Sequence, residues 1–267
     1  MLDIQSIMIF LILGSFVGVM AGLFGIGGGG IIVPVLTMFF VSHGFDGKNV
    51  MQISLATSMA VMSITSISSF RAQHKRKSVR WDLFVLIAPG VIVGTFALTF
   101  LASNIESFYL SVFFSLFMLY AALKMFFGKK PQKQGTAIGN KGQFFAGFGI
   151  GGLSALVSIG GGILSVPYLV KQGVDMKKAI GTSSAIGFPL AVSGTLGYII
   201  NGWSYTSADS FMIGYVYIPA FISISLASYA TAPIGVSLSH KLPVTTLKKI
   251  FAVLTFSLSV KMMLGLI

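Results

Sequence analysis

The sequence predicts an all-α polytopic membrane protein made of two inverted-topology repeats. Composition is the first reason, because 55% of the 267 residues are hydrophobic and only 9% are charged, whereas about a quarter are charged in soluble domains. The second is a series of apolar stretches long enough to cross a bilayer. The third is a glycine-rich segment that occurs twice. Together these features exclude an ordinary soluble domain.

Apolar stretches of membrane-spanning length run along the whole chain. A spanning helix needs roughly 20 apolar residues, because the bilayer core is about 30 Å thick. Eight stretches qualify: about Ile4–Phe24, Val50–Phe70, Leu83–Ala102, Ile105–Phe127, Gly142–Ser158, Ala179–Ile200, Ser210–Ser237 and Thr245–Ile267. Two shorter runs, Ile31–Val41 and Ile163–Val170, each follow a glycine-rich loop. We expect these two to be re-entrant or broken helices.

The chain contains an internal duplication. A shift of 133 residues places Gly14–Leu36 over Gly147–Leu169, with ten of 23 positions identical. A shift of 125 residues then places Ala56-Thr57-Ser58 over Gly181-Thr182-Ser183. We therefore divide the chain into a first membrane repeat at 1–127, a cytoplasmic linker at 128–141 and a second membrane repeat at 142–267.

The positions of the cations predict the orientation, because Lys and Arg in short loops mark the cytoplasmic side. Sixteen of the 18 lie in four segments: Arg71–Arg80, Lys124–Lys141, Lys171–Lys178 and Lys241–Lys249. The loop after the Thr57 stretch is then inside and its counterpart after Thr182 is outside, so the repeats are inverted and both termini are outside. Each half needs an odd number of crossings. Three full helices plus a glycine-rich hairpin satisfy this, as do five full crossings, and the short Ile31–Val41, about 16 Å as a helix, favours the hairpin.

The triplets Gly27-Gly28-Gly29 and Gly160-Gly161-Gly162 interrupt these helices. Non-helical backbone at membrane depth persists only where it is buried or lines a polar cavity. Each triplet precedes a short helix, whose free N-terminal amides and dipole attract anions. We expect the triplets to shape a substrate site where the two half-helices meet. The alternative is that these glycines only permit a tight hairpin.

Other residues near the triplets are candidate site residues. Hydroxyls at Thr57, Ser58, Thr182 and Ser183 match across the repeat, which favours a place in the site, although such hydroxyls also bond to their own helix. Pro34 and Pro167 are expected in or near the first turns of the half-helices, where they set the half-helix geometry. Earlier glycines at four-residue spacing, such as Gly14, Gly18, Gly22, Gly147 and Gly151, instead indicate close helix packing.

The acidic residues narrow the function. All six lie at or near segment ends: Asp3, Asp46, Asp82, Glu106, Asp175 and Asp209. Because carboxylates inside the membrane mark proton relays and cation sites, their absence there favours an anion held by neutral amides and hydroxyls. His74 in a basic loop is either a proton-linked residue or a solvated one. Enzyme motifs, a metal cluster, a cofactor site and a nucleic-acid surface are not indicated.

The features that carry a family resemblance are the segment Gly22 to Gly29 with Val33-Pro34, its copy ending Ile159 to Gly162 with Val166-Pro167, the two Thr-Ser matches and His74. In these features the sequence resembles the TauE/SafE family of sulfite and organosulfonate exporters. The resemblance spans nearly the whole chain. It implies a secondary transporter of a small sulfur-containing anion in the bacterial cytoplasmic membrane. The second copy departs from the first at Ser158 and Ile163, where the first has Gly25 and Gly30.

We therefore expect an anion transporter that works by alternating access, with the bilayer and a small anion as its partners. A passive anion channel or a non-transporting membrane scaffold is the alternative.

Overall fold

The computed structural model describes residues 3–25, 27–45, 47–127, 138–206, 211–241 and 244–264. Within these ranges the fold is all-α, apart from a short hairpin and a 3-10 turn at Trp203–Tyr205. The helices are α1 Ile4–Phe24, α2 Gly29–Ser42, α3 Val50–Lys75, α4 Trp81–Asn104, α5 Ser107–Phe127, α6 Asn140–Val157, α7 Gly162–Lys171, α8 Met176–Asn201, α9 Ile218–Lys241 and α10 Val244–Leu264.

Six of the described helices are long and apolar enough to cross a membrane, namely α1, α3, α4, α5, α8 and the Ile218–Ser239 part of α9. The expected short helices are confirmed, because α2 and α7 have only 14 and 10 residues. Two stretches expected to span fall outside this group. Helix α6 has 18 residues and carries Asn140, Lys141 and Gln143 in its first turn, and α10 contributes only Thr255–Leu264 as an apolar helix in the described part.

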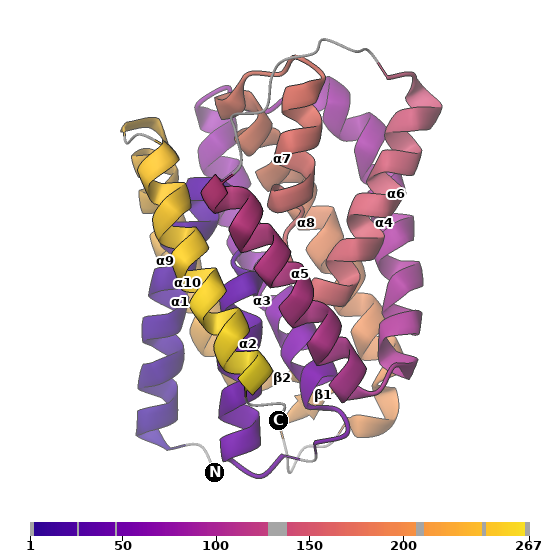
Figure 1. The fold of residues 1–267 in the computed structure, drawn as a ribbon, viewed down its shortest axis with the longest axis vertical. Coiled ribbons are helices and arrows are strands. Elements are labelled where there is room, and N and C mark those ends of the chain that lie inside the picture. The colour runs from indigo at the N-terminus through magenta and orange to yellow at the C-terminus, as the bar shows by residue number, and fades with distance from the viewer. Residues whose placement is uncertain are drawn as a thin grey trace.

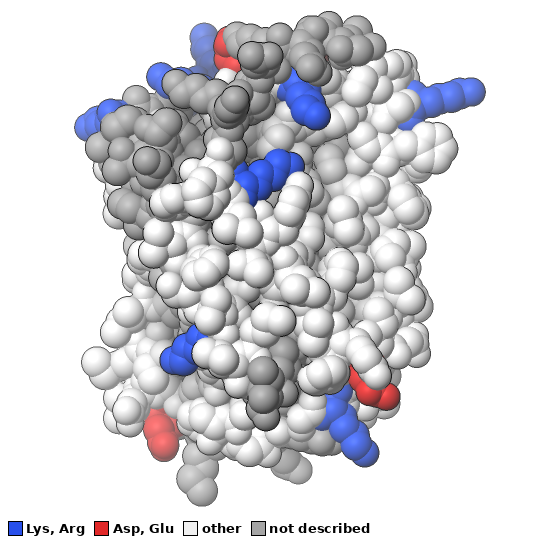
Figure 2. Space-filling view, in the orientation of Figure 1, with Lys and Arg blue, Asp and Glu red and all other residues white. Residues whose placement is uncertain are grey.

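Helices of the first half pair with helices of the second half throughout the bundle. Helix α1 packs against α9, α4 against α6, α3 against α8 and α5 against α10. Helix α3, at the centre, is the most buried of the candidate spans. In Figure 1, α1 begins and α10 ends at one end of the molecule, whereas α5 ends and α6 begins at the other. Most of the Lys and Arg visible in Figure 2 lie at this second end, which we call the cation-rich end.

Glycines bring two of these pairs into backbone contact. A β-carbon at Gly18 of α1 would lie 2.4 Å from the carbonyl oxygen of Ser228 in α9, and one at Gly147 of α6 would lie 2.3 Å from that of Ile87 in α4. Both separations are too short for any side chain. The predicted packing role of the glycine stripe is confirmed, because only glycine allows the helix axes to approach this closely.

The prediction of one helix over Ser210–Ser237 is wrong at its start. Strand β1 (Met212–Ile213) pairs antiparallel with β2 (Val216–Tyr217), with Met212 opposite Tyr217. Aromatic and β-branched residues favour strands, and Gly214, at a φ of +56°, makes the turn. Helix α9 then begins at Ile218, and Pro219 is accommodated in its first turn because the N–H that proline lacks has no helical partner there.

Helix α6 offers a matched test of the glycine contacts. Gly147→Ala forces α6 away from α4 and should lower the free energy of unfolding by about 1–3 kcal/mol. Gly149→Ala, on the same helix with no atom within 4 Å of the new β-carbon, should leave stability unchanged or raise it by up to about 1 kcal/mol. Thermal unfolding in detergent compares the two. Equal stability of both variants would contradict the proposed backbone contact.

Candidate functional site

The two glycine loops meet inside the bundle. A β-carbon at Gly27 would lie 3.0 Å from the Cα of Gly160, and one at Gly29 would lie 1.6 Å from the carbonyl oxygen of Ser158. Gly27 belongs to the connection between α1 and α2, and Gly160 to that between α6 and α7. The N-termini of α2 and α7 are therefore brought together, as the triplets predict.

Left-handed backbone conformations cap the helices around this crossing. Gly25 ends α1 at a φ of +66°, and Gly28 and Gly161 precede α2 and α7 at +84° and +74°. Glycine adopts these conformations without the steric cost that a β-carbon brings. Ser158 ends α6 at a φ of +46°, and its hydroxyl donates a 3.3 Å hydrogen bond to the carbonyl of Leu55. That bond gives a reason for serine where the first repeat has glycine.

The second departure between the repeats also has a packing reason. A β-carbon at Gly30 would lie 2.6 Å from the Cε of Met118 in α5, so a larger residue there would displace the end of that side chain. In the second half Ile163 stands at this position, and it is only partly buried. The two loops therefore share their backbone shape but differ in the side chains around them.

The two prolines occupy equivalent positions. Pro34 is the sixth residue of α2 and Pro167 the sixth of α7, near the first turns of the two helices as expected. A proline inside a helix cannot donate to the carbonyl four residues before it. The carbonyls of Gly30 and Ile163 are thereby left without their usual helical bond.

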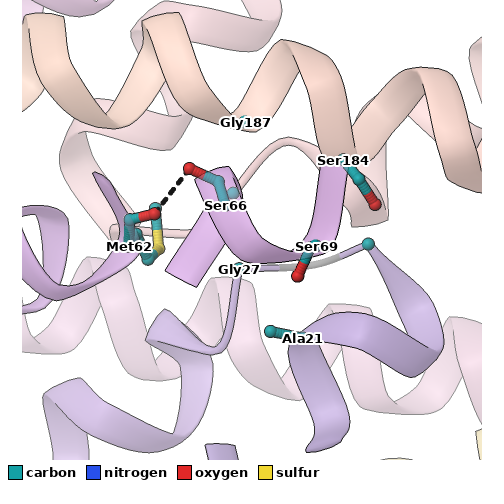
Figure 3. A pocket seen from close by; sticks show the side chains of 9 residues that line it. Ala21, Gly27, Met62, Ser66, Ser69, Ser184 and Gly187 are labelled. Carbon is teal, nitrogen blue, oxygen red and sulfur yellow. Dashed lines mark hydrogen bonds between the residues drawn. The ribbon is translucent and has the colours of Figure 1, made fainter. Parts of the chain in front are cut away.

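A small cavity lies beside the crossing (Figure 3). Its volume is about 10 Å³, room for about one water molecule. Helices α1, α3 and α8 and both glycine loops line it with Ala21, Gly25, Gly27, Met62, Ser66, Ser69, Gly160, Ser184 and Gly187. None of these nine residues is charged. Any anion held here would be held by hydroxyls and backbone amides.

The cavity contains unused hydrogen-bonding capacity. The hydroxyls of Ser66 and Ser184 donate to carbonyls of their own helices, at Met62 (2.6 Å) and Ile180 (3.0 Å). The Ser69 hydroxyl is buried and has no partner. Leaving a buried hydroxyl unpaired costs about 1–3 kcal/mol, and a water molecule or a solute in the cavity would pair with Ser69.

The expected site threonines each accept a backbone hydrogen bond at the start of a helix. The Thr57 hydroxyl accepts a 3.0 Å hydrogen bond from the backbone N–H of Tyr217, and the Thr182 hydroxyl accepts one of 2.9 Å from that of Arg80. Tyr217 directly precedes α9, and Arg80 directly precedes α4. Each threonine thus anchors the start of a helix of the other half: Thr57 holds the start of α9, and Thr182 holds the start of α4. Neither threonine lines the cavity.

The expected serines lie beside the loops rather than in the cavity lining. Ser183 donates a 3.2 Å hydrogen bond to the carbonyl of Gly25 and accepts one of 2.8 Å from Ser165. Ser58 is fully buried without a partner, and its Oγ lies 3.1 Å from where a β-carbon of Gly29 would be. Of the predicted site residues, only Gly27 and Gly160 line the cavity. Gly28, Gly29, Gly161 and Gly162 form the adjoining loop and helix starts.

Sequence reasoning missed Ser69 and did not single out Ser66 or Ser184. Met62, Ser66 and Ser69 follow the four- and three-residue spacing of one helix face, and this is the face of α3 on the cavity. That spacing was the available signal. We did not use this spacing, because the comparison of the repeats selects only positions with similar residues in both halves.

Charged groups lie outside the cavity. His74 is exposed and accepts a 3.2 Å hydrogen bond from the indole N–H of Trp81. Arg80 forms a surface ion pair with Asp82 at 2.6 Å, and the hydrogen bond to that carboxylate raises the pKa of the Arg80 guanidinium. Among the described residues no three His, Asp or Glu side chains are placed to share a metal ion.

Known proteins similar to this chain are membrane transporters by name. The family model described as sulfite exporter TauE/SafE matches residues 10–262. A probable membrane transporter protein of Haemophilus influenzae is 33% identical over 97% of this chain and 98% of its own. Probable membrane transporter protein MJ0441 of Methanocaldococcus jannaschii is 29% identical over 88% and 86%, and YunE of Bacillus subtilis is 30% identical over 76% and 83%. No solved structure matches the chain significantly.

The hydroxyl of Thr57 can be tested by a near-isosteric replacement. Thr57→Val leaves the Tyr217 amide unpaired and should lower the free energy of unfolding by about 1–3 kcal/mol, with the KM of transport unchanged. Thr99→Val is the control, since that hydroxyl donates to the carbonyl of Phe96 in its own helix. Thermal unfolding and transport kinetics are measured on both. A raised KM with unchanged stability in Thr57→Val would show a substrate contact instead.

Proposed function

This chain belongs to the sulfite exporter TauE/SafE family, and from that premise we propose that it is a secondary transporter of a small anion. The proposed substrate is sulfite or an organosulfonate, and the proposed route crosses the bacterial cytoplasmic membrane by alternating access. The family and the relatives support a membrane transporter. The substrate class and the mechanism are inferred from the site.

The observation that carries the proposal is the meeting of two helix N-termini at the crossed glycine loops. The first amides of α2 and α7 have no carbonyl partner within their own helices, and both helix dipoles direct positive charge toward the crossing. The cavity beside it offers hydroxyls and no carboxylate. Such a site favours a compact oxyanion, because its amides and hydroxyls donate hydrogen bonds and no carboxylate lines it to attract a cation.

Alternating access is supported by the reciprocal pairing of the helices. Helix α1, the first of one half, packs against α9, the fourth of the other, and α6 packs against α4 in the same relation. A two-fold relation between inverted halves generates such exchanged pairs. The cation-rich end and the shared end of the termini (Figures 1 and 2) agree with a cytoplasmic linker and two external termini. In such folds one arrangement of the halves opens inward and the exchanged one outward.

The proposed site is narrower than the sequence alone indicates. Gly27 and Gly160 contact the anion, and Gly28, Gly29, Gly161 and Gly162 orient the amides of the two helices. Ser58 and Ser183 support the loops. Thr57 and Thr182 are assigned to the helix anchors described above, and a proton-linked role of His74 stays a prediction.

The anion requires a wider cavity than this conformation offers. Room for about one water molecule is too small for sulfite, which has four heavy atoms. The helices that line the cavity must therefore separate before the anion enters. This requirement fits a transporter with closed intermediate states better than an open channel.

Transport into proteoliposomes tests the function. The purified protein should accumulate sulfite against its concentration gradient, with saturable kinetics, when an ion gradient is imposed. Competition by small sulfonates, and its absence with carboxylates of equal charge, would support the substrate class. A channel would carry sulfite only down its electrochemical gradient, and a scaffold would carry none, so either result would overturn the proposal.

A glycine pair tests the site. Gly161→Ala places a β-carbon at a φ of +74° where the nearest atom is 3.6 Å away, so the substitution affects the backbone rather than the space. The strain, about 1–2 kcal/mol, should turn the α7 amides and raise the KM about fivefold. Gly44→Ala has the same φ in an open loop and should leave the KM unchanged. An unchanged KM in Gly161→Ala would remove the α7 amides from the site.

A further inference from the structure

The cavity is displaced toward the cation-rich end of the molecule. Along α3, Ser69 is about 9 Å from Lys75 but about 28 Å from Val50, at 1.5 Å per residue. Along α8, Ser184 is about 12 Å from Met176, where Lys177 and Lys178 follow. Both serines therefore lie in the half of the bundle nearer the cations.

The internal repeat identifies what occupies the equivalent place in the other half. The 125-residue shift pairs Ser69 with Gly194 and Ser184 with Met59. The Sδ of Met59 lies 2.9 Å from where a β-carbon of Gly194 would be. The space that corresponds by the repeat to the serine-lined cavity lies toward the end opposite the cations. The side chain of Met59 fills it.

A polar stripe on α3 continues from the cavity to the cation-rich end. Ser66, Ser69 and Gln73 stand at positions i, i+3 and i+7, on one helix face, and all three are buried. The Ser69 hydroxyl and the Gln73 Oε1 have no hydrogen-bond partner. Buried polar atoms are nearly always paired. The stripe thus has hydrogen-bonding capacity that the protein itself does not use, and it ends beside Arg76 and Lys77.

The equivalent positions on α8 carry no hydroxyl that is free to bind a solute. They are Ala191, Gly194 and Tyr198. Tyr198 is fully buried, and its hydroxyl donates a 2.9 Å hydrogen bond to the carbonyl of Ala155. These positions therefore offer no unused hydroxyl to a solute.

An aromatic cluster, in addition to Met59, fills the bundle toward the end opposite the cations. The rings of Phe40, Phe45 and Tyr217 lie 4.8–5.7 Å apart between centroids. Tyr217 belongs to β2, which Thr57 anchors through the backbone. The hairpin therefore holds a buried ring over the end of the bundle opposite the cations.

We propose that Ser69 and Ser184 form an anion-contacting subsite that is reached from the cation-rich end along the α3 stripe, and that Met59 is the gate of the passage to the opposite end. The subsite rests on the proposed function and adds contacts to the glycine loops. Ser69 has a free hydroxyl to donate, and Ser184 supplies a second by rotating away from Ile180. The surrounding cations attract anions to this end of the stripe.

Transport kinetics test the subsite. Ser69→Ala and Ser184→Ala should each raise the KM for sulfite about tenfold, as expected when one hydrogen bond to a charged solute is lost, with little change in kcat. Ser115→Ala is the matched control, since that hydroxyl is also buried and unpartnered but lies on α5, away from the cavity lining. A wild-type KM in both cavity variants would overturn the subsite.

Thiol labelling tests the passage without any substrate. The natural chain has no cysteine, so Ser69→Cys, Ser184→Cys and Met59→Cys each introduce one reactive thiol. A membrane-impermeant anionic methanethiosulfonate, whose charge suits the proposed anion path, should label the first two in inside-out vesicles, from the cation-rich end, and Met59→Cys in right-side-out vesicles. Labelling is done without sulfite, which cleaves the mixed disulfide. Ser69→Cys and Ser184→Cys that stay unlabelled, or react from the opposite side, would overturn the passage.

The two experiments separate this inference from the proposed function. One-sided labelling in a protein that does not accumulate sulfite would retain the passage and overturn the substrate. Sulfite accumulation with a wild-type KM in the serine variants would retain the function and overturn the subsite. A Met59→Ala variant adds a check on the gate, because it should increase labelling of Gly194→Cys from the side of the termini, and unchanged labelling would overturn that role.

Discussion

The structure depends on one constraint, which is that the interrupted backbone at Gly27–Gly29 and Gly160–Gly162 must be enclosed. Peptide groups outside a helix cannot be left facing lipid. Here each loop covers the other, since Gly29 adjoins the Ser158 carbonyl and Gly27 the Gly160 backbone. Neither half can satisfy this alone. The duplication is therefore more than a repeated sequence, because the two copies complete one buried crossing.

Other contacts between the halves follow from that crossing. Glycines on α1 and α6 let those helices pack directly against α9 and α4. Thr57 and Thr182 fix the starts of α9 and α4 through backbone N–H groups. The outer helices are thus tied to α3 and α8, whose inner faces carry the cavity. In our account these contacts couple the outer helices to α3 and α8, so that a small movement at the crossing rotates several helices together, as alternating access requires.

The sequence contained much of the fold and part of the site. Hydropathy located the helices to within about five residues, except at the start of α9, and the repeat located Gly27 and Gly160. Hydropathy could not distinguish the hairpin at Met212–Tyr217 from the start of a helix, because both are apolar. The hydrogen-bond partners of Thr57 and Thr182 depend on three-dimensional packing. Ser69 was missed because the repeat comparison selects positions that are alike in both halves. The cavity lies where the halves differ, since the counterpart of Ser69 is Gly194.

The central claim is that the two halves are inserted in opposite orientations and meet at the glycine loops. A pair of reporter fusions tests it most directly, one inserted in the linker at 128–141 and one placed after Ile267. The account predicts a cytoplasmic reporter in the linker and an external reporter at the C-terminus. A cytoplasmic reporter at the C-terminus would contradict the inverted arrangement and the two-sided passage derived from it.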